Sequence, residues 1–188
     1  FEAGEMIRLL PVCDHYSGVE ARMRKSMELQ AQLGPVFDVT LDNEDGAPVG
    51  AEADHALLIS ELIMSSGNRH NRVGARVLPV GHSAFEQVVD TLVGKAGQRV
   101  AYLMVPKVRG LADLQSAVAS IDAATRNAGL QREIPVHALV ETHGALHEAF
   151  ALAAHPRIES LSFGLMDFVS AHRGAIPQSA MSVSGQFT

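Results

Sequence analysis

Short apolar segments alternate along this chain with longer stretches of helical periodicity. Six segments are apolar at most positions and often β-branched, which is typical of strands buried on both faces. We expect strands at residues 7–12, 36–41, 75–80, 100–105, 136–140 and 160–163. The stretches between them have the spacing of amphipathic or buried helices. They predict helices at residues 19–33, 53–66, 84–94, 111–128 and 144–154, followed by a loop from residue 171.

Strands that alternate with helices predict a parallel sheet with helical crossovers. A doubly wound sheet would be favoured by a glycine-rich phosphate turn after the first strand, and residues 13–18 contain no such motif. Polar residues instead follow nearly every strand, where a barrel has its active site. We therefore predict an α/β fold, a TIM (β/α)8 barrel, with about six βα units in this chain.

The domain organisation follows from the same count. The 188 residues suit one domain or a large part of one. The sequence contains no internal repeat, low-complexity tract or linker. Because six strands do not close an eight-stranded barrel, we predict that residues 1–188 form a single, partial TIM-barrel domain. Its last two βα units are expected to be absent or unseen.

Composition and charge narrow the range of partners. The net charge is −6 and no continuous basic patch is visible, which argues against nucleic acid and anionic membranes as partners. No run approaches the roughly 18 apolar residues of a transmembrane helix. The single cysteine, Cys13, excludes an internal disulfide and fits a reducing cytoplasm. We interpret Cys13 as a small buried strand residue rather than a nucleophile.

Carboxylates are concentrated after the second predicted strand. Asp42, Glu44 and Asp45 lie within four positions, a density that is repulsive unless a cation or a basic group is near. A solvated acidic turn is the alternative, and this segment alone leaves both open.

Two further acids follow strands five and six. Glu141 comes directly after an apolar run, and Asp167 lies between Met166 and Phe168. Mg²⁺ prefers oxygen ligands, takes one or two carboxylates and keeps several waters. We therefore predict that Glu141 and Asp167 hold Mg²⁺. The alternative is that one acid pairs with a basic side chain and no metal is held.

Two basic residues are candidates for that cluster. Arg76 adjoins an apolar run, and a buried arginine could bind a substrate carboxylate with its planar fork. Lys107 follows strand four and could stabilise charge or pair with the acids. A Schiff-base lysine is the less favoured interpretation, because the acids already indicate a metal.

The histidines give weaker signals. His143 and His147 are four apart, but Glu148 lies outside the pair, so this is not the HExxH motif. We expect both to be surface residues. His15 and His82 follow strands one and three, so either could be an acid or base or an ordinary loop residue.

Six short motifs follow one another along the chain. They are the apolar segment 7–12 and the segments LDNEDG at 41–46, RVL at 76–78, VPKV at 105–108, VET at 140–142 and FGLMDF at 163–168. In this order they resemble the citrate lyase β-subunit family, within the HpcH/HpaI aldolase group, whose opening strand is followed by D-L-E-D-G/A, R-V-N, P-K-V, I/V-E-T and F-G-x-x-D-F/L. Each motif alone is weak, but six in the family's order are specific. Asn43 and Leu78 depart from the usual leucine and asparagine, which leaves the substrate open.

The resemblance implies a Mg²⁺-dependent carbon–carbon lyase of the citryl-, malyl- or citramalyl-CoA type. Such enzymes act on 3-hydroxyacyl-CoA thioesters and release an acyl-CoA and a keto acid. It implies metal ligands at Glu141 and Asp167, a carboxylate-binding Arg76, and acid/base work by Asp45 ahead of Glu44. The family's C-terminal lid often comes from a neighbouring subunit, so we expect a homo-oligomer. Nothing in residues 1–188 corresponds to that lid.

Two other functions stay open at this point. One is a CoA-independent class II pyruvate aldolase, which shares the barrel and the metal and would use His15 or His82 as its base. The other is a non-catalytic binding relative of the same fold. The presence of Glu141, Asp167 and Arg76 argues against it.

Overall fold

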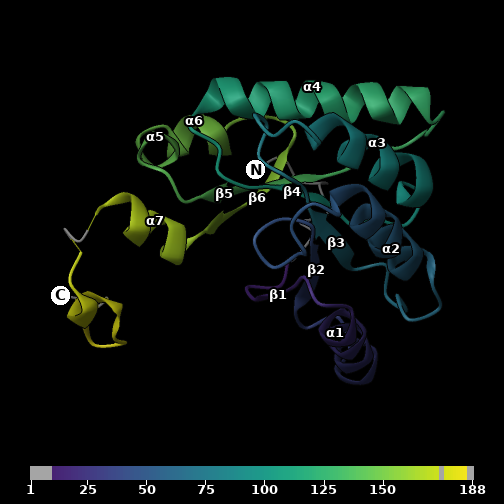
Figure 1. Ribbon diagram of the computed structural model, residues 1–188, viewed down its shortest axis with the longest axis horizontal. Coiled ribbons are helices and arrows are strands. Elements are labelled where there is room, and N and C mark those ends of the chain that lie inside the picture. Colours follow the sequence, from purple (N-terminus) through teal and green to yellow (C-terminus); the bar gives the residue numbers. More distant parts are fainter. Residues whose placement is uncertain (1–9, 174–175, 186–188) are drawn as a thin grey trace, which may run out of the picture.

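The backbone forms one curved sheet of six parallel strands in chain order (Figure 1). The computed structural model describes residues 10–173 and 176–185. Each strand is hydrogen-bonded to the next strand along the chain, as in the wall of a barrel, so the sheet is a half-barrel. The strands are β1 (Asp14–Ser17), β2 (Asp38–Asp42), β3 (Val73–Arg76), β4 (Leu103–Val105), β5 (Val136–Val140) and β6 (Ile158–Phe163).

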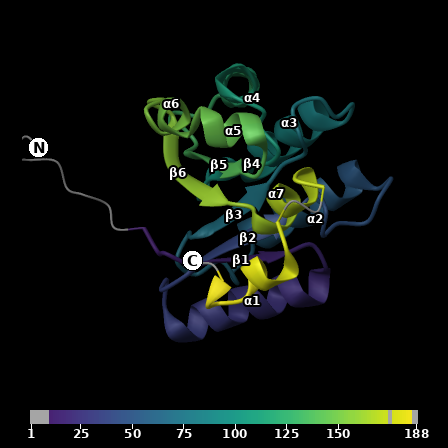
Figure 2. The same cartoon turned by 90° about the vertical axis from the view of Figure 1, so that its left-hand side faces the viewer.

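Helices cover the outer side of this sheet. Figures 1 and 2 show α1 to α4 following one another in an arc around it. The helices are α1 (Glu20–Leu33), α2 (Glu52–Met64), α3 (Phe85–Ala96), α4 (Leu111–Asn127), α5 (His143–His147), α6 (Ala149–Ala153) and α7 (Leu165–Ala171), with a 3₁₀ turn η1 (Gln178–Met181). The predicted α/β barrel class is thereby confirmed.

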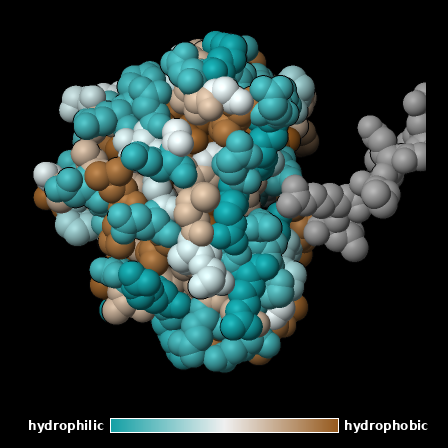
Figure 3. Space-filling model, turned by 90° about the vertical axis from the view of Figure 1, so that its right-hand side faces the viewer, coloured by the Kyte–Doolittle hydropathy of each residue, from teal (hydrophilic) through white to brown (hydrophobic). Residues whose placement is uncertain are grey.

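The main hydrophobic core lies between the sheet and the helices. Alternate strand residues such as Val39 and Leu41 are fully buried there, together with Ile59 of α2 and Leu92 of α3. On the side of α1, α2 and α3 the molecular surface is mainly hydrophilic with scattered apolar residues (Figure 3). This pattern is expected when amphipathic helices turn their apolar faces toward a sheet.

The inner face of the sheet carries polar side chains instead. Thr40 donates to the Asp14 carboxylate at 2.6 Å, and its hydroxyl lies 2.7 Å from that of Tyr102. The Tyr102 ring stacks on His137 with centroids 3.8 Å apart, and His137 lies 2.9 Å from a Glu159 oxygen. Strand alternation therefore places an apolar face outward and a mixed face inward, where these polar groups lie beside the buried Met104 and Leu139.

The first strand was predicted in the wrong place. The structure has β1 at Asp14–Ser17, while residues 10–12 are not strand and residues 7–9 lie outside the described part of the chain. Cys13 is exposed, so its interpretation as a buried strand residue is wrong. The pairing of Asp14 with Asp38 and of Ser17 with Leu41 fixes the register. This strand presents Asp14 and Tyr16 inward, so it lacks the apolar run that guided the prediction.

The remaining boundaries follow the prediction more closely. The strand at 136–140 has the predicted bounds, whereas β3 ends at Arg76, four residues earlier than expected. The helix expected at 144–154 is two short helices. They meet at Glu148, whose carboxylate accepts a hydrogen bond from the Leu111 amide at 2.6 Å. The α7 helix and the 3₁₀ turn within the expected loop were not predicted.

Among the helices of the described segments, none is long and apolar enough to cross a membrane.

Candidate active site

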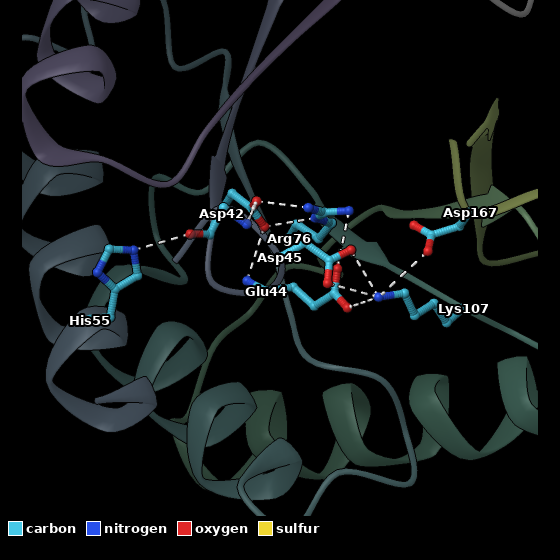
Figure 4. A network of polar contacts seen from close by, with 8 residues as sticks. Asp42, Glu44, Asp45, His55, Arg76, Lys107 and Asp167 are labelled. Carbon is cyan, nitrogen blue, oxygen red and sulfur yellow. Dashed lines mark hydrogen bonds and ion pairs between the residues drawn. The ribbon is translucent and has the colours of Figure 1, made fainter. Parts of the chain in front are cut away.

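The predicted site residues converge at the C-terminal ends of the strands, and Figure 4 shows Glu44, Asp45, Arg76, Lys107 and Asp167 among them. Arg76 ends β3, Lys107 follows β4, and Glu141 directly follows β5. Asp167 belongs to the first turn of α7, where the helix dipole favours a negative charge. A cavity of about 770 Å³ opens beside them. Its lining includes Asp45, Arg76, Glu141 and Asp167.

Asp42 orients Arg76. The two residues face each other in the β2–β3 register, and Nε and Nη2 of Arg76 each donate to an Asp42 oxygen at 2.7 Å. Asp42 also accepts the backbone amides of Glu44 at 2.9 Å and Gly46 at 2.8 Å. It therefore shapes the acidic turn as well. Sequence reasoning placed Asp42 in an acid cluster but missed this structural role, which depends on strand register.

The acidic turn is built around cations. The side chain of Glu44 is 6% exposed and lies 3.2 Å from Nη1 of Arg76. The Lys107 ammonium pairs with Glu44 and lies 2.8 Å from an Asp45 oxygen. Asp167 is more distant from the same ammonium, at 4.0 Å. The alternative of a solvated turn is thus excluded for Glu44, since its charge is met by two basic groups.

Lys107 is held in its charged form. Burial alone would lower the pKa of its ammonium, but hydrogen bonds to Asp45 and Glu44 raise the pKa above its ordinary value. Schiff-base chemistry requires a neutral amine as nucleophile. The geometry therefore favours a charge-stabilising lysine over a nucleophilic one.

The two candidate bases differ in their environment. Burial raises the pKa of Glu44 despite the hydrogen bond from Lys107. Burial also acts to raise the pKa of Asp45, but hydrogen bonds, that from Lys107 first, outweigh it and lower the pKa. Asp45 is more exposed, with 53% of its side chain accessible. It lines the cavity as an ionised carboxylate, whereas Glu44 is not part of the lining.

Glu141 is positioned by backbone contacts. The residue is 2% exposed, and its Oε1 accepts the Lys107 amide at 2.6 Å. An ideal Cβ at Gly164 would lie 2.2 Å from Oε2 of Glu141, so the carboxylate occupies space that only glycine leaves free. Gly164 belongs to the 163–168 motif, but its steric role was not predicted, because the need for it arises from the close approach of two strand ends.

Glu141 and Asp167 have the properties of a hard-cation site. Burial raises the pKa of Glu141; the Lys107 amide opposes this, and the nearby charge of Asp167 reinforces it. A divalent cation would remove that electrostatic cost. Within residues 10–173 and 176–185, no three His, Cys, Asp or Glu side chains are grouped to complete a metal site. Two carboxylates with water or substrate oxygens in the other positions match the preference of Mg²⁺.

The histidine candidates lie outside the cavity. His15 has its Nδ1 2.8 Å from the Ser26 hydroxyl of α1, and Nδ1 of His82 accepts the Ala84 amide at 3.1 Å. Neither belongs to the cavity lining, so neither is placed to act as a base there. His143 and His147 are exposed, as expected.

A tyrosine that the sequence did not indicate lies beside Arg76. The guanidinium carbon of Arg76 is 5.4 Å from the centroid of the Tyr16 ring, a cation–π distance. Tyr16 projects inward from β1 and lines the cavity. It was missed because the first strand was expected at residues 7–12, which placed Tyr16 in a turn.

Known proteins resemble the chain in sequence and in fold. The HpcH/HpaI aldolase/citrate lyase family model matches residues 27–179. A citrate lyase structure from Burkholderia xenovorans LB400 superposes with a TM-score of 0.91 and 50% identity, over 99% of this chain and 58% of that one. The L-malyl-CoA/beta-methylmalyl-CoA lyase of Cereibacter sphaeroides is 28% identical over 133 residues, which are 70% of this chain and 42% of that protein.

A more distant structure shares the fold alone. The Haloferax volcanii malate synthase magnesium/glyoxylate complex has a TM-score of 0.75 and 18% identity, over 90% of this chain and 56% of that one. The chain spans about half the length of these three proteins, between 42% and 58%.

Proposed function

This chain belongs to the HpcH/HpaI aldolase/citrate lyase family, and we propose that it carries the site of a Mg²⁺-dependent carbon–carbon lyase. The substrate would be a 3-hydroxyacyl-CoA thioester of the citryl-, malyl- or citramalyl-CoA type, and the products an acyl-CoA and a keto acid. The observation that supports this most is the meeting of Glu141, Asp167 and Arg76 in one cavity. The names of the lyases that it resembles support the reaction class.

In this proposal Glu141 and Asp167 hold the metal. The malate synthase with the same fold was solved with magnesium and glyoxylate, which is consistent with an ion and a keto acid as ligands of this fold. Bound Mg²⁺ would supply Lewis-acid polarisation of the keto-acid oxygens. The Lys107 amide and the space left by Gly164 would keep Glu141 in place for that role.

Arg76 would bind the carboxylate of the keto acid. Its Nε–Nη2 edge is already taken by Asp42, so the fork predicted from the sequence is not wholly free. Guanidinium carries five N–H donors. Nη1 also lies 3.2 Å from Glu44, so only the N–H groups of Nη1 and Nη2 that face neither Asp42 nor Glu44 remain for substrate. The Asp42 pair would fix the plane of the guanidinium and limit reorientation when substrate binds.

Asp45 would act as the base, ahead of Glu44. In cleavage Asp45 takes the proton of the 3-hydroxyl group, and the oxygen electron pair forms the carbonyl of the keto acid. The carbon–carbon bond breaks, and its electrons pass to the enolate of the acyl-CoA. General base catalysis of this kind contributes about 10²–10⁴-fold. The Lys107 ammonium would keep Asp45 ionised before the step.

The partners in this proposal are an acyl-CoA thioester, a keto acid and further copies of the protein. A segment of a neighbouring subunit would cover the cavity in a homo-oligomer. A cytoplasmic location fits these metabolites and the exposed thiol of Cys13, which stays reduced there.

A panel of 3-hydroxyacyl-CoA thioesters, assayed with Mg²⁺ for released acetyl- or propionyl-CoA, tests the reaction. The metal assignment is tested by Glu141→Ala and Asp167→Ala, with Glu61→Ala as a control acid on the exposed face of α2. We expect each site variant to lose Mg²⁺ affinity in calorimetry and turnover, while the control keeps both. A folded site variant with normal affinity and rate would show that its residue is not a ligand.

The same assays separate the two alternatives. Cleavage of free hydroxy-keto acids without CoA would indicate a pyruvate aldolase. A folded protein that binds no Mg²⁺ and cleaves nothing would indicate a binding relative.

A further inference from the structure

The hydroxyl of Tyr16 is buried and unpaired. Across the described ranges, 10–173 and 176–185, no group meets it with full hydrogen-bond geometry, although the Ser162 and Asp14 side chains lie near enough to act on its pKa. A buried hydroxyl without a partner is unfavourable for folding. Because Tyr16 lines a cavity, a molecule bound in that cavity is the simplest partner for its hydroxyl.

The surroundings define what that partner is. The Tyr16 ring lies against the Arg76 guanidinium, and Ser162 of β6 belongs to the same cavity wall. Burial raises the pKa of the Tyr16 phenol, the charge of Asp14 adds to this, and Arg76 and Ser162 oppose it. The phenol is therefore a neutral hydrogen-bond donor. Its partner would be an oxygen on a molecule that Arg76 also contacts.

We propose that Tyr16, assisted by Ser162, determines specificity by donating a hydrogen bond to an oxygen on the substituent of the keto carbon. This inference rests on the proposed function, which places the keto acid beside Arg76. A keto acid with a carboxylate on that substituent satisfies the hydroxyl. One with hydrogen or methyl leaves it unpaired, and sites with unpaired buried polar groups discriminate strongly.

Tyr102 provides a matched contrast on the same face of the sheet. Its hydroxyl is also buried, but lies 2.7 Å from that of Thr40, and Tyr102 is not part of the cavity lining. Removing the Tyr102 hydroxyl breaks its hydrogen bond with Thr40 inside the protein, whereas removing the Tyr16 hydroxyl breaks no such bond. Tyr102→Phe should therefore lower the stability of the protein, whereas Tyr16→Phe should change keto-acid binding.

The experiment compares Tyr16→Phe, Ser162→Ala and Tyr102→Phe with the wild-type protein. Calorimetry with Mg²⁺ gives the dissociation constants of oxaloacetate, pyruvate and glyoxylate, and thermal unfolding without ligand gives Tm. Phenylalanine preserves the ring and its contact with Arg76. We expect Tyr16→Phe to weaken oxaloacetate binding about tenfold, with pyruvate and glyoxylate within about twofold, and Tm unchanged or higher. Ser162→Ala should have a smaller effect in the same direction.

Tyr102→Phe should lower Tm and leave the oxaloacetate-to-glyoxylate ratio unchanged. The proposal is overturned if Tyr16→Phe keeps the wild-type ratio, since the hydroxyl then contacts only water or protein. A wild-type protein that binds none of the three keto acids would overturn both this inference and the proposed function. Failure of the Tyr16 assignment alone is distinguished by wild-type binding with an unchanged ratio.

Discussion

Gly164 is the position where a single methyl group should disable the proposed metal site. Its backbone has φ −90°, which alanine also adopts, so the effect of Gly164→Ala is steric. The new Cβ would lie 2.2 Å from Oε2 of Glu141, where ordinary contacts begin at 3.4 Å. The carboxylate must therefore move by about 1.2 Å, the difference between these two values.

Gly164→Ala should reduce both the stability of the protein and its catalytic rate. Overpacking of this kind typically costs about 1–3 kcal/mol of stability. A displacement of roughly 1 Å in a catalytic group costs on the order of 100-fold in rate. We expect Gly164→Ala to fold, to melt at a lower temperature, and to lose turnover together with Mg²⁺ affinity, because the proposed ligand is the group that moves.

Gly94→Ala is the matched control. A Cβ at Gly94, within α3, meets nothing within 4 Å, and alanine is favoured over glycine in a helix by roughly 0.5–1 kcal/mol. The control should be as stable as the wild type or more so, with full activity. Calorimetry with Mg²⁺, thermal unfolding and the thioester assay measure all three properties. If Gly164→Ala has wild-type Mg²⁺ affinity and rate, the reasoning about Glu141 is wrong.

Three further outcomes are expected. Arg76→Lys should lose most lyase activity while staying folded, because an ammonium cannot reproduce the planar fork; near-normal kcat/KM would instead indicate a structural ion pair. Asp42→Ala should lose on the order of 3 kcal/mol in urea unfolding, since it breaks a buried pair, whereas Glu20→Ala in an exposed pair should lose less than about 1 kcal/mol. Burial raises the pKa of Asp14 above 3.8, so its contribution to stability is complete below that pH and is lost as pH rises through the raised pKa. Asp14→Asn should therefore be more stable than the wild type at pH 7 and lose this advantage toward pH 3, and an equal difference at both pH values would contradict the assignment.

The strands were predictable where both faces are apolar. Residues 136–140 have an apolar side chain at every position except His137, and the structure places β5 there with the predicted bounds. β1 fails this criterion, because Asp14 and Tyr16 face a polar interior that local composition does not reveal. The seven-residue α7 helix was missed because a short helix after a glycine has little periodicity to detect.

The site was predictable as a set of residues but not as a set of contacts. The acids at Asp42–Asp45 indicated a nearby cation, yet Lys107 is 62 residues away from Asp45 in sequence. Only the order of β2, β3 and β4 in the sheet brings these groups together. The pairing of Asp42 with Arg76 likewise depends on register, which no short motif specifies.

Lys107 has a positive φ of 51°, a backbone conformation that is uncommon for residues other than glycine and costs about 1–3 kcal/mol. Its amide hydrogen-bonds to Glu141, and its ammonium to Glu44 and Asp45. One residue thus fixes the distance between the proposed metal ligand and the proposed base. Glycine at this position would relieve the strain and keep the amide contact with Glu141, but it would lose the positive charge that Glu44 and Asp45 require. Only a lysine in this unfavourable conformation makes both contacts. Relaxation of the strained Lys107 backbone would therefore shift the contact with Glu141 and the contact with Asp45 at the same time.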